Sequence, residues 1–179
     1  MQAFSKKFSP PFNVSFALLS SYKEATPVGK SRILEVVDIN MNMAWGFFEG
    51  ACQGQRQICG LGFILFFLDS HFVTGKANMA SGTKNQGELK ALFALLKCDL
   101  SWDVLALQVM GDSKFTVDWM NDVTCLENLD LMALGQSLKS ISALFHHFNY
   151  RHVYRDQNST IDSLSKDALG LAENLMILE

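Results

Sequence analysis

Four separated acidic residues carry most of the chemical information in this chain of 179 residues. Two of them end apolar, strand-like runs, and two lie early in helical patterns. They are Glu49 in Phe47-Phe48-Glu49-Gly50, Glu88 in Asn85-Gln86-Gly87-Glu88-Leu89, Asp112 in Met110-Gly111-Asp112-Ser113, and Asp162 in Thr160-Ile161-Asp162-Ser163. Carboxylate oxygens are the hard ligands that Mg²⁺ prefers. The pattern therefore predicts a carboxylate cluster that holds divalent cations for phosphodiester chemistry.

The periodicity of apolar residues predicts the elements that must bring these acids together. Alternating or continuous apolar runs indicate strands, and apolar residues three and four apart indicate helices. The predicted strands are 43–52, 58–68, 71–77, 104–110 and 148–154, and the predicted helices are 85–100, 113–121, 129–145 and 159–175. The order is βββαβααβα.

This order predicts an α/β fold with a mixed five-stranded sheet flanked by helices. The first three strands follow one another closely enough to form an antiparallel meander, and the later strands are reached through helical crossovers that favour parallel pairing. In such a sheet the ends of the first and fourth strands can meet at a topological switch point. Glu49 lies toward the end of the first strand and Asp112 just past the end of the fourth, so we expect these two acids to be neighbours.

Composition predicts one globular domain with an extension. All three prolines lie within the first 40 residues, so we interpret 1–42 as a flexible leader or linker and 43–175 as the domain. With 49% hydrophobic residues the domain can bury a sizeable core. The net charge of −3 argues against a simple electrostatic nucleic-acid binder. It does not argue against a metal-dependent nuclease, because bound cations offset the acids of such a site.

The four cysteines form no C-x-x-C pair and no histidine lies at finger-like spacing, so we expect no zinc site. We interpret Cys52, Cys59, Cys98 and Cys125 as buried free thiols of an intracellular protein, in the nucleus or cytoplasm. The lysines and serines of the first 23 residues leave organellar targeting as an alternative. The apolar stretches are too short to cross a bilayer, so we expect no membrane partner.

Four motifs in order resemble the ribonuclease H family, and most closely the ribonuclease H-like domains of plant retroelements and their domesticated relatives. The resemblance covers residues 44–171. The motifs are Phe48-Glu49-Gly50-Ala51, Thr83-Lys84-Asn85-Gln86-Gly87-Glu88-Leu89, Gly111-Asp112-Ser113, and the stretch from His152 to Lys166.

The resemblance implies a ribonuclease H-like fold and an endoribonuclease that hydrolyses the RNA strand of RNA–DNA hybrids by a two-metal mechanism. It implies that two Mg²⁺ (or Mn²⁺) ions are held by the catalytic residues Glu49, Glu88, Asp112 and Asp162. We expect a monomer that binds RNA–DNA hybrid or RNA. The expected nucleic-acid contacts are Thr83, Lys84, Asn85, Gln86, Ser113, Lys114, Arg151, His152, Arg155 and Asn158.

The chain departs from the family pattern at its first acid, where the family has Asp and this chain has Glu49. Glu is one methylene longer, and a shift of roughly 1 Å can cost about a hundredfold in rate. Lys84 and Gly87 also replace the usual Asn and Ala. Two alternatives therefore stay open: a catalytically weakened module that binds RNA or hybrid, and a protein-interaction scaffold that kept only the fold.

Overall fold

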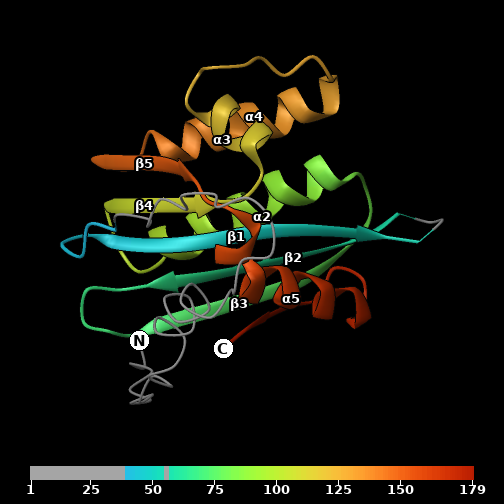
Figure 1. Ribbon diagram of the computed structural model, residues 1–179, viewed down its shortest axis with the longest axis horizontal. Helices are drawn as coiled ribbons and strands as arrows, with labels where there is room; N and C mark the ends of the chain where they lie inside the picture. The colour runs from blue at the N-terminus through green and yellow to red at the C-terminus, as the bar shows by residue number, and fades with distance from the viewer. Residues whose placement is uncertain (1–38, 55–56) are drawn as a thin grey trace, which may run out of the picture.

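The computed structural model describes residues 39–54 and 57–179. The predicted leader, 1–42, lies almost wholly outside this part of the chain. Six strands form one mixed sheet in the order β5-β4-β1-β2-β3-β6 (Figure 1). Their bounds are β1 Ala44–Gln53, β2 Ile58–Phe66, β3 Phe72–Ser81, β4 Ala106–Gly111, β5 His147–His152 and β6 Met176–Leu178.

The strand directions confirm the predicted topology. The pairs β1–β2 and β2–β3 are antiparallel, whereas β1–β4 and β4–β5 are parallel. Strand β1 therefore separates the antiparallel half of the sheet from the parallel half, which is the predicted switch point. The short strand β6, antiparallel to β3, was not predicted and lies beyond the predicted end of the domain.

Helices cover both faces of the sheet (Figure 1). They are α2 Lys84–Leu100, α3 Lys114–Met120, α4 Leu129–Ser142 and α5 Ser159–Asp167, with the 3-10 turns η1 Arg155–Gln157 and η2 Ala168–Gly170. Side chains alternate between the two faces of β1: Phe48 joins the main core with α2 and α4, and Phe47 joins a smaller core with Ile161 of α5. None of the helices in the described part is long and apolar enough to span a bilayer.

The final helix is shorter than predicted. The apolar pattern predicted a helix over 159–175, but α5 ends at Asp167 and the 3-10 turn that follows reaches only Gly170. The buried Asn78 side chain of β3 donates from Nδ2 to the carbonyl oxygens of Leu169 (3.2 Å) and Leu171 (2.9 Å). This interaction satisfies carbonyls that a longer helix would have used, and the chain continues to the sheet edge as β6.

The prediction of four buried free thiols was wrong. Cys52 of β1 faces Cys59 of β2 in the antiparallel register, and the two form a disulfide with a Cα–Cα distance of 4.1 Å. Cys98 is a buried free thiol, whereas the free thiol of Cys125 is exposed. The pairing depends on the register between two strands, and the composition of each strand alone does not reveal it.

We expect Asp99→Asn to stabilise the fold increasingly as pH rises. Asp99 is fully buried near the end of α2, and no hydrogen-bond partner within the described residues reaches its carboxyl oxygens. Burial raises the pKa of Asp99 to about 8. The unfolded chain ionises this carboxyl near pH 4 and the folded protein near pH 8, so wild-type stability falls across that window, whereas Asn does not titrate.

Urea unfolding at pH 5 and pH 8 tests this expectation. We compare the unfolding free energy of Asp99→Asn with that of wild type at each pH. From pH 5 to pH 8 the variant should gain roughly 1–3 kcal/mol relative to wild type, the usual cost of a buried unpaired polar group. Asp103→Asn, at an exposed position nearby, controls for the loss of charge. If Asp99→Asn and wild type differ in unfolding free energy by the same amount at pH 5 and at pH 8, the expectation is contradicted.

Candidate metal centre

The register between β1 and β4 places two acids side by side. Phe47 pairs with Met110 in the parallel ladder, and Glu49 and Asp112 each lie two residues further along their strand direction. Because alternate residues of a strand share a face, both acids emerge on the face that carries Phe47 and Met110. These two residues belong to the smaller core with Ile161 of α5. The predicted neighbourhood of Glu49 and Asp112 is thus present.

A capping box fixes where α2 begins and therefore where Glu88 lies. The Thr83 hydroxyl accepts from the backbone N–H of Gln86 (3.3 Å), and the Gln86 side chain accepts from the N–H of Thr83 (2.9 Å). This exchange satisfies two N–H groups at the helix start. Glu88 then lies five residues after the cap, on the buried side of the helix against β1.

A glycine on β1, Gly50, allows α2 to approach the strand closely enough to bring Glu88 beside Glu49. A Cβ atom on Gly50 would lie 2.3 Å from the Glu88 backbone nitrogen and 2.3 Å from the Gly87 carbonyl carbon. A Cβ on Gly87 would lie 3.4 Å from the Gly50 Cα, an ordinary contact. The close approach therefore requires glycine at position 50 and not at position 87. The packing role of Gly50 was not predicted from the sequence, although a glycine one residue after a candidate ligand is a visible signal.

We expect Gly50→Ala and Gly87→Ala to change stability in opposite directions. Gly50→Ala forces backbone against backbone and should lower the free energy of unfolding by about 3 kcal/mol or more. Gly87→Ala fits the available space and should raise it by up to about 1 kcal/mol through helix propensity. Urea unfolding of both variants tests the pair. A Gly50→Ala variant as stable as wild type would show that the helix can move away from the strand at little cost.

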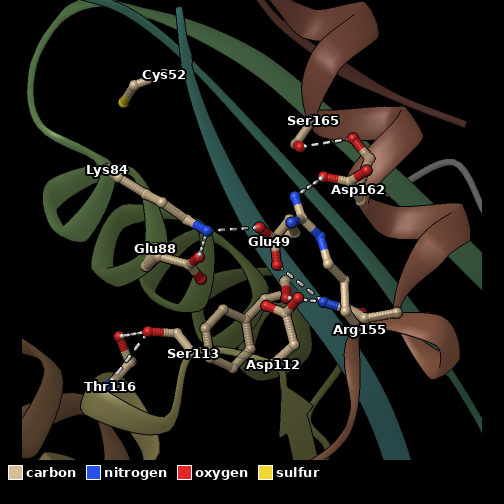
Figure 2. Close-up of polar contacts among 12 residues, drawn as sticks. Glu49, Cys52, Lys84, Glu88, Asp112, Ser113, Thr116, Arg155, Asp162 and Ser165 are labelled. Atoms are coloured by element: carbon tan, nitrogen blue, oxygen red, sulfur yellow. Dashed lines mark hydrogen bonds and ion pairs between the residues drawn. The ribbon is translucent and has the colours of Figure 1, made fainter.

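Three of the four predicted acids form one cluster. Glu49, Glu88 and Asp112 each offer a carboxylate oxygen, and these oxygens lie within 4.8 Å of one another (Figure 2). Glu49 and Glu88 are almost completely buried. Both oxygens of Glu88 and Oδ1 of Asp112 are buried without a hydrogen-bond partner in the described part of the chain. Ligands about 2.1 Å from one Mg²⁺ lie at most about 4.2 Å apart, so a small inward movement suits the cluster to a cation.

The charges of the cluster oppose one another when no cation is bound. Burial, a hydrogen bond with Asp112 and the negative charge of Glu88 raise the pKa of Glu49 to about 10. Burial and the negative charge of Asp112 raise the pKa of Glu88 to about 8. Lys84 offsets part of both effects, because its Nζ lies 3.8 Å from Glu49 Oε1 and 3.8 Å from Glu88 Oε1. Crowded carboxylates of this kind favour either protons or cations.

Asp162 lies outside this cluster. Its Oδ1 lies 3.7 Å from an Arg155 guanidinium nitrogen, and its Oδ2 accepts a hydrogen bond from Lys166, one helical turn later on α5 (Figure 2). The fully buried Asn158 joins α5 to the cluster instead, because its Nδ2 donates to Glu49 Oε2 (3.0 Å) and to the Phe48 carbonyl (3.1 Å).

Comparison with known proteins agrees with this architecture. The sequence model of the family described as reverse transcriptase-like matches residues 47–168, which include all four acids. The chain belongs to the reverse transcriptase-like family. No curated protein sequence matches it.

Solved structures show that this member of the reverse transcriptase-like family has the ribonuclease H fold. Ribonuclease H1 of the halophilic archaeon Halobacterium salinarum is 24% identical with a TM-score of 0.67, covering 71% of this chain and 97% of that one. The N-terminal ribonuclease H domain of Rv2228c from Mycobacterium tuberculosis is 25% identical with a TM-score of 0.67, covering 71% and 93%. LC11-RNase H1, solved in complex with an RNA/DNA hybrid, is 19% identical with a TM-score of 0.64, covering 70% and 96%.

In this reverse transcriptase-like domain, some of the residues predicted to contact nucleic acid form helix caps or ion pairs, and others are exposed. Thr83 and Gln86 form the cap of α2, and Ser113 caps α3. Lys114 pairs with Asp118, and His152 Nε2 lies 3.2 Å from the Asp112 carbonyl oxygen. Asn85, Lys114, His152 and Arg155 are exposed, Arg151 is half-buried, and Asn158 is buried. Lys84 points its ammonium at Glu49 and Glu88.

Proposed function

We propose that this protein is a divalent-metal-dependent endonuclease that hydrolyses the RNA strand of RNA–DNA hybrids. The observation that carries the proposal is the largely buried cluster of Glu49, Glu88 and Asp112 at the switch point of a ribonuclease H fold. Its orphaned oxygens are the donor set that Mg²⁺ or Mn²⁺ prefers. One solved structure with this fold, LC11-RNase H1, is itself a complex with an RNA/DNA hybrid, which supports the choice of substrate.

In this proposal the three clustered acids hold the cations, and Asp162 completes the set when it leaves Lys166 and Arg155. Two bound divalent ions supply an activated water and a stabilised leaving oxygen in phosphodiester hydrolysis. Asn158 positions Glu49 through its hydrogen bond to Oε2. The rigid backbone of β1 and β4 holds Glu49 and Asp112 in place, and the contact of Gly50 with Gly87 holds Glu88 beside them.

The exposed polar side chains around the cluster are the proposed substrate contacts. Asn85 lies in the first turn of α2 and is exposed, so it is available to an RNA 2′-hydroxyl in the shallow minor groove of a hybrid. Lys114, His152 and Arg155 are exposed as well. The positively charged side chains of Lys114 and Arg155 suit contacts with phosphates. Distinguishing a hybrid from duplex DNA depends on the 2′-hydroxyl contacts, because phosphates are common to both.

A second candidate function is hybrid or RNA binding without efficient cleavage. Two observations favour it: the longer side chain of Glu49, and the Lys84 ammonium 3.8 Å from two of the three clustered acids. Both work against tight binding of a second cation. A protein-interaction scaffold remains the third reading, and it predicts neither metal binding nor salt-dependent hybrid binding.

Cleavage of a hybrid labelled on its RNA strand tests the proposal. We expect RNA-strand cleavage with Mg²⁺ or Mn²⁺, none with a chelator, and none of a DNA duplex of the same sequence. Asp112→Asn, purified in parallel, controls for a contaminating nuclease. Salt-dependent binding of the hybrid without cleavage would favour the binding module, and the absence of both would favour the scaffold.

A further inference from the structure

Lys84 lies at the mouth of the acidic cluster. It is the first residue of α2, directly after the Thr83 cap, and its side chain is 57% exposed. Its Nζ lies 3.8 Å from both Glu49 Oε1 and Glu88 Oε1, so one ammonium bridges two elements of the site (Figure 2). A positive group in this place faces the same oxygens that the proposed function assigns to a cation.

Local structure explains why Lys84 points inward. Lys84 and Glu88 are four residues apart on α2, and such pairs lie on one face of a helix. The capping box of Thr83 and Gln86 fixes the first turn and so the direction in which Lys84 leaves the helix. Neither oxygen of Glu88 has a hydrogen-bond partner in the described residues, which leaves the Lys84 ammonium as the charge that compensates this buried carboxylate.

We propose that Lys84 is a resident counter-ion that competes with the divalent cation for Glu49 and Glu88 and thereby lowers the metal affinity of the site. The inference rests on the proposed function, since it assigns these carboxylates to a metal. An ammonium and a divalent cation repel each other at this range, so Lys84 must swing outward when a cation binds. Its exposure allows that movement. Lys84 is thus a positioning residue that sets the concentration of divalent cation needed to fill the site.

The size of the effect follows from the exposure of the lysine. An ion pair with an exposed partner contributes only modestly because solvent screens it, and a bound cation displaces two such pairs. We therefore expect removal of the charge at position 84 to tighten divalent metal binding by about tenfold. Glutamine keeps a good helix former in this first turn, so Lys84→Gln should fold normally.

Calorimetric titration of the nucleic-acid-free protein with Mg²⁺ and with Mn²⁺ tests the inference without any measurement of activity. Lys84→Gln should bind each ion about tenfold more tightly than wild type, and Lys84→Arg, which keeps the charge, should remain within about twofold. Lys97→Gln is the matched control. It removes the same charge from the last turn of α2, where Nζ of Lys97 lies over the Phe93 ring at 5.3 Å, and should bind metal like wild type.

Asp112→Asn separates failure of this inference from failure of the proposed function. If Asp112→Asn weakens metal binding and Lys84→Gln leaves it unchanged or weakens it, the acids bind the metal but Lys84 does not compete, and the inference is overturned. If Asp112→Asn binds metal as well as wild type does, or if wild type and Lys84→Gln both bind none, the cluster is not a metal site and both proposals fail.

Discussion

Asp112→Asn is expected to lower the rate of hybrid cleavage by at least about a hundredfold while leaving the metal-free protein as stable as wild type or more so. Asn has nearly the shape of Asp but cannot supply the negative charge. Asp112 lies within 4.8 Å of two buried carboxylates and raises the pKa of both. Removing its charge therefore relieves repulsion in the free protein and weakens the cation site. Single-turnover cleavage and thermal unfolding, measured on the same preparation, separate the two effects.

The matched control for Asp112→Asn is Asp156→Asn. Asp156 is exposed on η1 and lies outside the cluster, so the substitution removes one negative charge without touching the proposed ligands. We expect this control to cleave at the wild-type rate. Cleavage by Asp112→Asn at the wild-type rate would show that the reaction, or a contaminating enzyme, uses another site. A loss of stability that parallels the loss of rate would instead indicate a role for Asp112 in folding.

We expect Glu49→Asp to raise the rate of hybrid cleavage by about a hundredfold. In the family motif this position is Asp, and a displacement of about 1 Å at a catalytic group can cost a hundredfold. In this structure Oε2 of Glu49 accepts from Asn158 at 3.0 Å and Oε1 lies 3.8 Å from Lys84. The shorter side chain draws the carboxylate toward β1 and leaves more room for a cation between Glu49 and Asp112.

Glu88→Asp is the matched control for Glu49→Asp. It removes one methylene from another acid of the same cluster, but at a position where the motif has Glu, so we expect a slower reaction. If Glu49→Asp speeds cleavage and Glu88→Asp slows it, the site needs a short acidic side chain at position 49 and a long one at position 88. A Glu49→Asp variant that cleaves no faster than wild type would mean that the β1 backbone already compensates for the longer side chain.

The order of the first five strands and the four helices was predictable from the sequence, because each of these elements follows from a periodicity within one segment. A short, largely apolar run marked β1, and apolar spacings of three and four marked α2. The adjacency of Glu49 and Asp112 was also predictable, because a helical crossover favours a parallel neighbour at the switch point.

Most of the other side-chain contacts could not be predicted, because they arise from how the elements pack on one another. The β1–β2 register joined Cys52 to Cys59, and Asn78 ended the last helix by binding carbonyls about ninety residues away along the chain. Packing of α2 on Gly50 turned Lys84 toward the acids, whereas Asp162 pairs with its own neighbours on η1 and α5. Such contacts depend on the register and distance between elements far apart in sequence. A periodicity reports which face of an element is buried, and it leaves open which residue lies opposite.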